Sequence, residues 1–236
     1  MHPQSVRRES AMWHGRHAPT QDNASLTRWL VLAGVVMFLL YLCMDVTATL
    51  LYGGYSYRDQ TISELSAIGA PTRRFWIIMS IAYQVLLFAF AAGVLRASGR
   101  SSLLRIIAVL VIVWSLTNLL WWFGPMHRRE VPDAAGGDWH DTLHLTIGGI
   151  TSLLFFAIIG VGSFAFDKAF RWYSFGTLII MLVFGALMNT HMKGVANDEP
   201  TPWLGVYERL AIEGAMLWLA VFSARLAWGP RAEAQN

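Results

Sequence analysis

The sequence has few charged residues and almost no cysteine. Lysine, arginine, aspartate and glutamate make up 14% of its 236 residues, well below the roughly 25% of a soluble globular domain. The single cysteine, Cys43, excludes a disulfide within the chain and a metal site built from several thiolates. A formal net charge of +3 does not indicate nucleic acid as a partner.

Hydrophobic residues make up 55% of the chain and gather in long runs. A helix needs about 20 mostly apolar residues to cross a bilayer. Runs of that length lie at residues 29–52, 75–95, 103–123, 141–166, 172–191 and 203–226. The sequence therefore predicts an all-α integral membrane protein. We expect one domain of six transmembrane helices (26–228) between a disordered polar tail (1–25) and a short C-terminal tail (229–236).

The distribution of basic residues predicts the orientation. Six spans put both termini on one side of the membrane. Eleven of the 18 lysines and arginines fall on that side, within residues 7–28, 96–105, 168–171 and 225–231. Cytoplasmic segments are enriched in such residues, so we expect cytoplasmic termini and a bacterial plasma membrane. The longer loops after the first, third and fifth spans then face the periplasm or exterior. The sequence carries no signal for an oligomeric state.

The first of these outer loops carries a helix-start signal. Thr61 and Glu64 have the spacing of a capping box, and Gly69 with Pro71 fits a helix stop. The pattern predicts a short interfacial helix over Ile62–Ile68. Ser63 inside it offers a hydroxyl nucleophile, for which the sequence identifies no base.

The second outer loop, Pro125–His144, is the longest polar stretch between two apolar segments. It contains His127, His140 and His144 among several acids and arginines. Residues four apart on a helix lie on one face, one turn apart, and His140 and His144 open the fourth span. This is the spacing of a pair of zinc ligands on one helix.

One hypothesis from this pattern is a metal-assisted hydrolase acting on a lipid or amphiphile at the outer face. His140 and His144 would bind zinc, with His127 or His191 as the third ligand. A catalytic zinc ion keeps a position for water and lowers the pKa of that water. The candidates for the general base are Glu64, Asp141 and Glu208.

The same residues fit other interpretations. The histidines and acids could satisfy loop backbone and pair with Arg128, Arg129 and Arg209 in a structural network. The protein would then be a non-enzymatic binder of a lipid or small molecule, a transport-related protein or a partner-interaction protein. A proton-coupled or anion-binding pocket is a further alternative.

Two acids lie deeper in the predicted spans. At 1.5 Å per residue, Asp45 and Glu213 lie about 10 Å and 15 Å from the outer ends of their helices. An ionised carboxylate at that depth costs a few kcal/mol unless it is paired, so such groups face the bundle interior. Both are candidate binding residues, as are Arg128, Arg129 and Arg209. The neighbouring Glu208 and Arg209 are predicted to form an internal ion pair, and the alternative is that Arg209 binds an anionic head group.

Four short motifs carry a family resemblance. They are ISELSAIGAP (62–71), PMHRRE after the third span, the Asp141–His144 start of the fourth span, and YERL (207–210). Together these motifs resemble the bacterial and archaeal membrane family catalogued as domain of unknown function 998. The resemblance covers roughly residues 30–228 and implies six membrane helices with signature residues on one face, but no activity. The His140–His144 pair is also distantly similar to the zinc hydrolases of the ceramidase and adiponectin-receptor superfamily.

Overall fold

A computed structural model describes residues 21–130 and 138–229 of the chain. Its α-helices are α1 (Gln21–Leu51), α2 (Arg73–Ser98), α3 (Ser102–Asn118), α4 (Trp139–Gly162), α5 (Lys168–Thr190), α6 (Met192–Ala196) and α7 (Leu204–Trp228). Two 3₁₀ helices, η1 (Ile62–Ser66) and η2 (Leu119–Trp122), lie between them. Most of the expected N-terminal tail (1–20), part of the polar stretch (131–137) and most of the C-terminal tail (230–236) fall outside the described residues.

Six of these helices are long and apolar enough to cross a membrane, which confirms the predicted fold class. The observed bounds differ from the predicted spans at several ends. α1 begins at Gln21, within the segment expected to be a polar tail, because a polar turn continues the helix beyond its apolar part. The short interfacial helix is a 3₁₀ helix ending at Ser66. The short helix α6 was not predicted.

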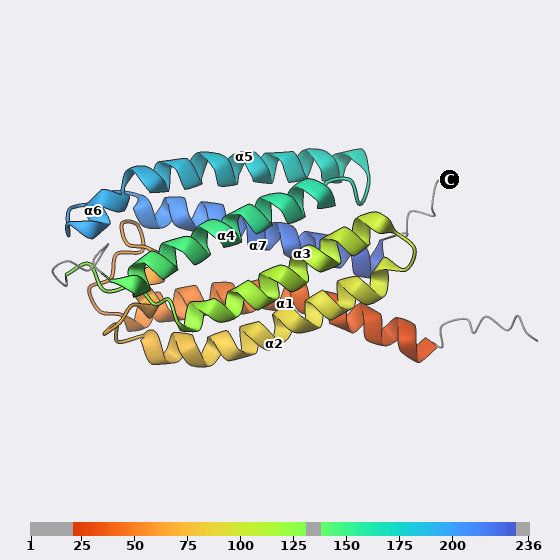
Figure 1. Ribbon diagram of the computed structural model, residues 1–236, viewed down its shortest axis with the longest axis horizontal. Helices are drawn as coiled ribbons and strands as arrows, with labels where there is room; N and C mark the ends of the chain where they lie inside the picture. Colours follow the sequence, from red (N-terminus) through yellow and green to blue (C-terminus); the bar gives the residue numbers. More distant parts are fainter. Residues whose placement is uncertain (1–20, 131–137, 230–236) are drawn as a thin grey trace, which may run out of the picture.

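Each of the six long helices runs antiparallel to the long helix before it in the sequence (Figure 1). Consecutive helices α1 to α4 pack side by side, α5 packs on α7, and α7 returns to pack on α1. We call the end that carries segments 52–72, 123–130 and 191–203 the loop end. The opposite end, the terminal end, holds the start of α1 and the end of α7. Both ends of the described chain therefore lie on one side, as an even number of spans requires.

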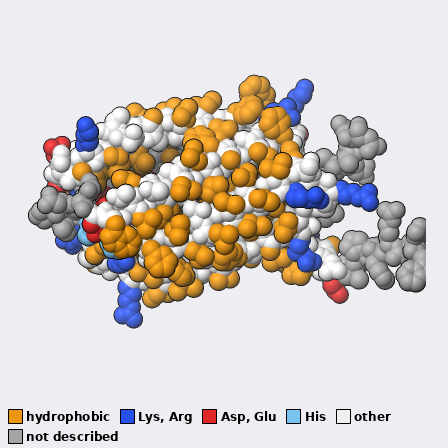
Figure 2. All heavy atoms as spheres, viewed as in Figure 1, with side chains coloured by type: hydrophobic (Ala, Val, Ile, Leu, Met, Phe, Trp, Pro, Cys, Tyr) orange, Lys and Arg blue, Asp and Glu red, His pale blue; other side chains and the backbone are white. Residues whose placement is uncertain are grey.

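The outer surface matches a bilayer environment. Hydrophobic side chains cover the middle of the bundle, and charged side chains gather towards its two ends (Figure 2). Exposed apolar residues such as Leu50, Leu153 and Val85 lie on the helices rather than in the loops. Lipid tails can cover such a surface without a free-energy cost, whereas its exposure to water would be unfavourable.

The core is centred on buried aromatic rings near the terminal end. Trp218 of α7 stacks on Phe222 with ring centroids 5.2 Å apart, and its Nε1 donates to Ser174 Oγ of α5 at 2.8 Å. A Cβ atom on Gly162 of α4 would lie 2.5 Å from the Trp218 ring. Glycine is therefore required where α4 ends against α7, as small residues often are at helix contacts in membranes.

A buried ion pair joins α1 to α7 below the loop end. Arg209 donates from Nη2 to Asp45 Oδ1 at 2.7 Å and from Nε to Asp45 Oδ2 at 2.8 Å. The side chains of both residues are almost fully buried. Arg209 also donates from Nη1 to the carbonyl oxygen of Tyr57, which fixes the loop above. A paired, hydrogen-bonded charge is the form in which a buried carboxylate is tolerated in a membrane.

This geometry corrects the predicted pairing of Arg209 with Glu208. Successive residues of a helix point about 100° apart, so the two side chains leave α7 in different directions. Arg209 faces Asp45 of α1, and Glu208 faces η1. Glu213, one turn beyond Arg209, is partly exposed.

Replacement of Arg209 by methionine should strongly destabilise the bundle. The substitution leaves the Asp45 carboxylate buried without its partner, for which the cost is about 3–5 kcal/mol. Arg58→Met is the matched control, because Arg58 pairs with Asp59 at an exposed position and such pairs contribute about 0–1 kcal/mol. Unfolding in detergent measures both variants. Equal stability of the two would show that the buried pair does not hold the helices together.

Candidate functional site

The loop end is organised around η1, whose start follows from local sequence. Thr61 Oγ1 accepts the Glu64 backbone N–H, and Glu64 Oε2 accepts the Thr61 N–H at 2.7 Å. This is the capping box expected from the sequence. After η1, the Ile68 N–H donates to the Met126 carbonyl at 2.8 Å. The turn that carries Ser63 is therefore anchored to the segment that carries His127.

Glu64 is fully engaged by Arg129. Arg129 donates from Nε to Glu64 Oε1 at 2.6 Å and from Nη2 to Glu64 Oε2 at 2.8 Å. Its Nη1 donates to Thr201 Oγ1, which in turn donates to the Asp59 carbonyl. The Glu64 carboxylate therefore locks three loops together, and its role as a general base stays a prediction. The neighbouring Arg128 pairs with Glu130 near the surface.

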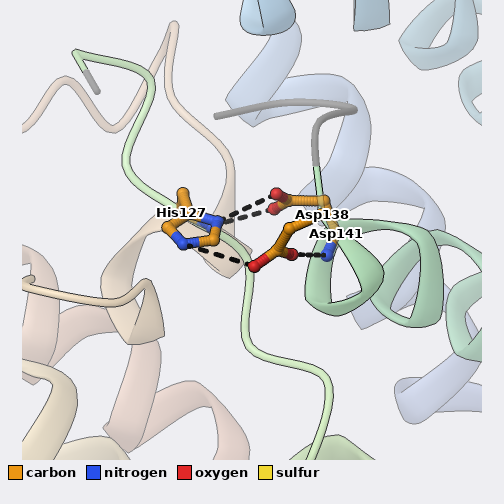
Figure 3. A group of neighbouring side chains, drawn as sticks. All are labelled: His127, Asp138 and Asp141. Carbon is orange, nitrogen blue, oxygen red and sulfur yellow. Dashed lines mark hydrogen bonds and ion pairs between the residues drawn. The ribbon is translucent and has the colours of Figure 1, made fainter. Parts of the chain in front are cut away.

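Asp141, at the start of α4, holds His127 by two bonds. Asp141 Oδ1 accepts the His127 backbone N–H at 3.0 Å, and its Oδ2 lies 2.9 Å from His127 Nδ1. Asp138 caps α4 by accepting the N–H groups of His140 and Asp141. The other oxygen of Asp138, Oδ2, lies 3.9 Å from His127 Nε2. Figure 3 shows the two ring nitrogens of His127 facing the carboxylates of Asp138 and Asp141.

These three residues are the one group, within residues 21–130 and 138–229, that could hold a metal ion. One ligand atom from each lies within 4.8 Å of the others. The group includes only His127 of the four histidines in the sequence hypothesis. Asp141, a candidate base in that hypothesis, here orients the imidazole.

His140 and His144 bind consecutive backbone carbonyls at the end of the third span. His140 Nδ1 lies 3.1 Å from the Phe123 oxygen, and His144 Nδ1 lies 2.8 Å from the Gly124 oxygen. The spacing of four thus places both rings on one face of α4, as expected, but that face clamps backbone. A Cβ atom on Gly124 would lie 3.0 Å from Ile147, so glycine permits this close approach.

His191 lies apart from the other histidines, at the end of α5. Its Nδ1 is 3.1 Å from the Leu187 carbonyl oxygen, and its ring packs near Tyr207 of α7 with centroids 5.9 Å apart. Of the four histidines in the sequence hypothesis, His127 and His140 lie close to each other, with ring centroids 6.3 Å apart, whereas His144 and His191 have other partners.

Ser63 connects η1 with α4 and α7. Ser63 Oγ lies 3.1 Å from His144 Nε2 and 3.4 Å from Glu208 Oε1. Glu208 also accepts the Ile62 backbone N–H through Oε2. The residue Glu208 is buried, whereas Ser63 and His144 are partly exposed. A hydroxyl, an imidazole and a carboxylate from three elements thus meet at one point.

The His144 hydrogen bonds fix which ring nitrogen carries the proton. A carbonyl oxygen only accepts, so Nδ1 must donate to Gly124. In the neutral ring, Nε2 is then the acceptor and faces the Ser63 hydroxyl. A nucleophile, a base and a third group that orients the base are the parts of an activated serine.

Two other side chains near η1, those of Tyr55 and Asp59, have fixed protonation states. Burial raises the pKa of the Tyr55 hydroxyl, so it stays protonated and donates to the Thr61 carbonyl at 2.8 Å. Hydrogen bonds from Arg58 and from the Trp203 backbone lower the pKa of Asp59 to about 2. Asp59 is therefore a fixed anion at the start of α7, and Tyr55 is a fixed neutral donor below Thr61.

Family comparison supports the sequence resemblance. A family model described as "Protein of unknown function (DUF998)" matches residues 26–225. The chain belongs to this family. No curated protein and no solved structure matches it. The DUF998 resemblance of the motifs is thereby confirmed, and the likeness to the ceramidase and adiponectin-receptor superfamily stays a prediction.

The grouping around Ser63 in this DUF998 protein was missed by sequence reasoning. Ser63 was recognised as a hydroxyl in a capped turn, but its partner His144 lies 81 positions away in the chain. The available signal was that Ser63, His144 and Glu208 are all predicted to lie near the same membrane boundary. That signal predicts that the three residues lie at a similar depth in the membrane, but it does not predict which side chains contact each other.

Replacement of Arg129 by methionine should loosen η1. The Glu64 carboxylate would lose both of its charge-assisted hydrogen bonds, each of which contributes about 1.5–3 kcal/mol. Hydrogen–deuterium exchange over residues 61–68 should therefore become faster. Arg128→Met serves as the control, since Arg128 pairs at a more exposed position. Unchanged exchange in Arg129→Met would show that η1 is held by other contacts.

Proposed function

We propose that this membrane protein is a serine hydrolase that cleaves an acyl ester of a lipid or amphiphile at its loop end. The observation that carries the proposal is the 3.1 Å contact between Ser63 Oγ and His144 Nε2, with His144 Nδ1 bound to the Gly124 carbonyl. The reaction retains the lipid hydrolysis expected from the sequence but uses a serine in place of a zinc-bound water.

The proposed reaction has two half-reactions. Ser63 Oγ attacks the acyl carbon as His144 Nε2 takes the hydroxyl proton. The bond from the acyl carbon to the alcohol oxygen then breaks, and the alcohol leaves with the proton from Nε2. A water molecule attacks the acyl-serine by the same route, which releases the fatty acid and restores Ser63. The Gly124 carbonyl stabilises the imidazolium that forms in each half-reaction.

Glu208 positions the nucleophile. Its Oε2 accepts the Ile62 N–H, and its Oε1 lies 3.4 Å from Ser63 Oγ, so it fixes η1 against α7. Positioning matters because a serine must stay within hydrogen-bond distance of its base to react. Arg129 and Glu64 support η1 from its other side.

We further propose that the loop end faces the periplasm or exterior of a bacterial plasma membrane. The basis is the bias of lysine and arginine towards the terminal end, which favours the cytoplasm for that end. The proposed substrate would then come from the outer leaflet.

A small fluorophosphonate should label Ser63 in the purified protein. Ser63→Ala should abolish the labelling, and His144→Phe should slow it by about 10²–10⁴-fold, the usual contribution of a general base. Ser66→Ala is the matched control, because Ser66 lies in the same 3₁₀ helix but donates to the Ser63 carbonyl. Intact mass and peptide mapping measure the modification. Equal labelling of Ser63→Ala and wild type would reject Ser63 as the nucleophile.

A divalent cation site is a second candidate, favoured by the convergence of His127, Asp138 and Asp141. His127 Nε2 and Asp138 Oδ2 lie 3.9 Å apart and would be the residues that hold a zinc ion, whose bonds to nitrogen and oxygen are each about 2.0–2.2 Å. Asp141 would orient the ring through Nδ1, as carboxylates behind ligand histidines commonly do. The ion would fasten segment 125–130 to α4.

Zinc binding should depend on His127 and not on the other two histidines of the loop. We expect His127→Ala to lower the zinc content of the purified, zinc-dialysed protein. The double variant His140→Ala, His144→Ala should retain zinc, because those rings bind carbonyls through Nδ1. Elemental analysis measures both. Zinc lost only in the double variant would restore the site expected from the sequence, and equal content in all three proteins would exclude both sites.

A further inference from the structure

The helices α4 and α5 diverge towards the loop end. In Figure 1 they meet near the turn that joins them and separate towards α6, with α7 between them. They share few contacts compared with the other neighbouring helices. α4 instead follows α3, where Trp114 packs on Phe155 with ring centroids 4.8 Å apart. α5 follows α7, where Phe184 stacks on Tyr207 at 6.0 Å.

Burial along the two helices marks the same divergence. The last buried residue of α5 is Met181, and none of residues 182–190 is buried. On α4, no residue between Ile147 and Phe155 is buried. A Cβ atom on Gly185 of α5 would meet no other atom within 4 Å. The loop-end halves of α4 and α5 therefore do not close against each other.

The floor of this opening is a face of α7 with small side chains. Glu208 marks the flank of α7 that faces α4, because its partner Ser63 bonds His144. Tyr207 marks the flank that packs on α5. Ala211 follows these residues by three and four positions, so it lies between the two flanks. Ala211 is partly exposed although it faces the bundle, which indicates space above it.

The opening leads to the proposed nucleophile. Its walls are α4 and α5, its floor is α7, and Ser63 lies at its loop end in contact with both α4 and α7. Because these helices are membrane spans, the opening faces lipid hydrocarbon. Of the molecules in that layer, an acyl chain has the shape and polarity to lie along an apolar slot between helices.

We propose that the opening between α4 and α5, over Ala211, admits the acyl chain of a lipid directly from the bilayer. The inference rests on the proposed function, because it assigns the chain whose ester bond Ser63 attacks. The carbonyl would reach Ser63 while the hydrocarbon tail stays between the helices. The substrate class is thus a long-chain acyl ester that enters sideways rather than from water.

A bulky residue at Ala211 should discriminate between long and short acyl-type probes. We expect Ala211→Trp to slow Ser63 modification by a hexadecyl fluorophosphonate roughly tenfold or more, because the indole ring would occupy the path of the chain and a misplacement of about 1 Å at the reacting atoms can cost about 10²-fold. Modification by an ethyl fluorophosphonate should keep its wild-type rate. Ala211→Leu, a smaller change, should give a smaller loss with the long probe. Leu210→Trp is the matched control, because Leu210 is an exposed neighbour on another face of α7.

The outcomes separate the two proposals. If neither probe labels Ser63 in the wild type, the proposed function is wrong and the inference falls with it. If both probes label the wild type and Ala211→Trp slows neither, or slows both equally, the opening is not the route of the acyl chain. The same conclusion follows if Leu210→Trp has the effect of Ala211→Trp. A selective loss with the long probe in both Ala211 variants supports the route.

Discussion

The pairing of buried charges between distant helices is the constraint on which the loop end depends. Inside a bilayer a lone carboxylate or guanidinium is costly, so Asp45 and Arg209 must meet, and their meeting sets α1 against α7. Arg129 and Glu64 form a second buried pair closer to the loop end, to which the same constraint applies. Between these two pairs, η1 has little freedom to move. The serine that it carries is therefore held in position by these charged pairs together with the packing of Ile62 and Leu65 in a small hydrophobic cluster.

The sequence predicted the local features well because they depend on short spacings. Runs of apolar residues define the six spans, and the Thr61–Glu64 spacing defines the start of η1. Burial of Asp45 was expected from its depth alone, but its partner was not, since Arg209 lies 164 positions away. The expected Glu208–Arg209 pair failed for a geometric reason, because neighbours on a helix point in different directions. Long-range pairing requires the helix order around the bundle, which hydrophobic patterns do not specify.

The histidines illustrate how one spacing supports two kinds of chemistry. Side chains four apart on a helix face the same way, and in a zinc site both imidazoles would meet one ion. Here the same geometry lets His140 and His144 meet two consecutive carbonyls, those of Phe123 and Gly124. Whether the two rings bind a metal ion or backbone carbonyls depends on how closely another backbone segment approaches the helix. Gly124 permits such a close approach. The consequence is chemical, because a carbonyl on Nδ1 leaves Nε2 of His144 as an acceptor facing Ser63.

The anchoring of α4 at its two ends explains how its middle can remain unpacked on one side. At the loop end, His140, His144 and Asp141 tie it to the segments around 123–127. At the terminal end, Gly162 meets the Trp218 ring of α7. A helix fixed at both ends and supported by α3 along its length has no need of further contact with α5. The fold can therefore leave the loop-end halves of α4 and α5 apart, beside the proposed nucleophile Ser63.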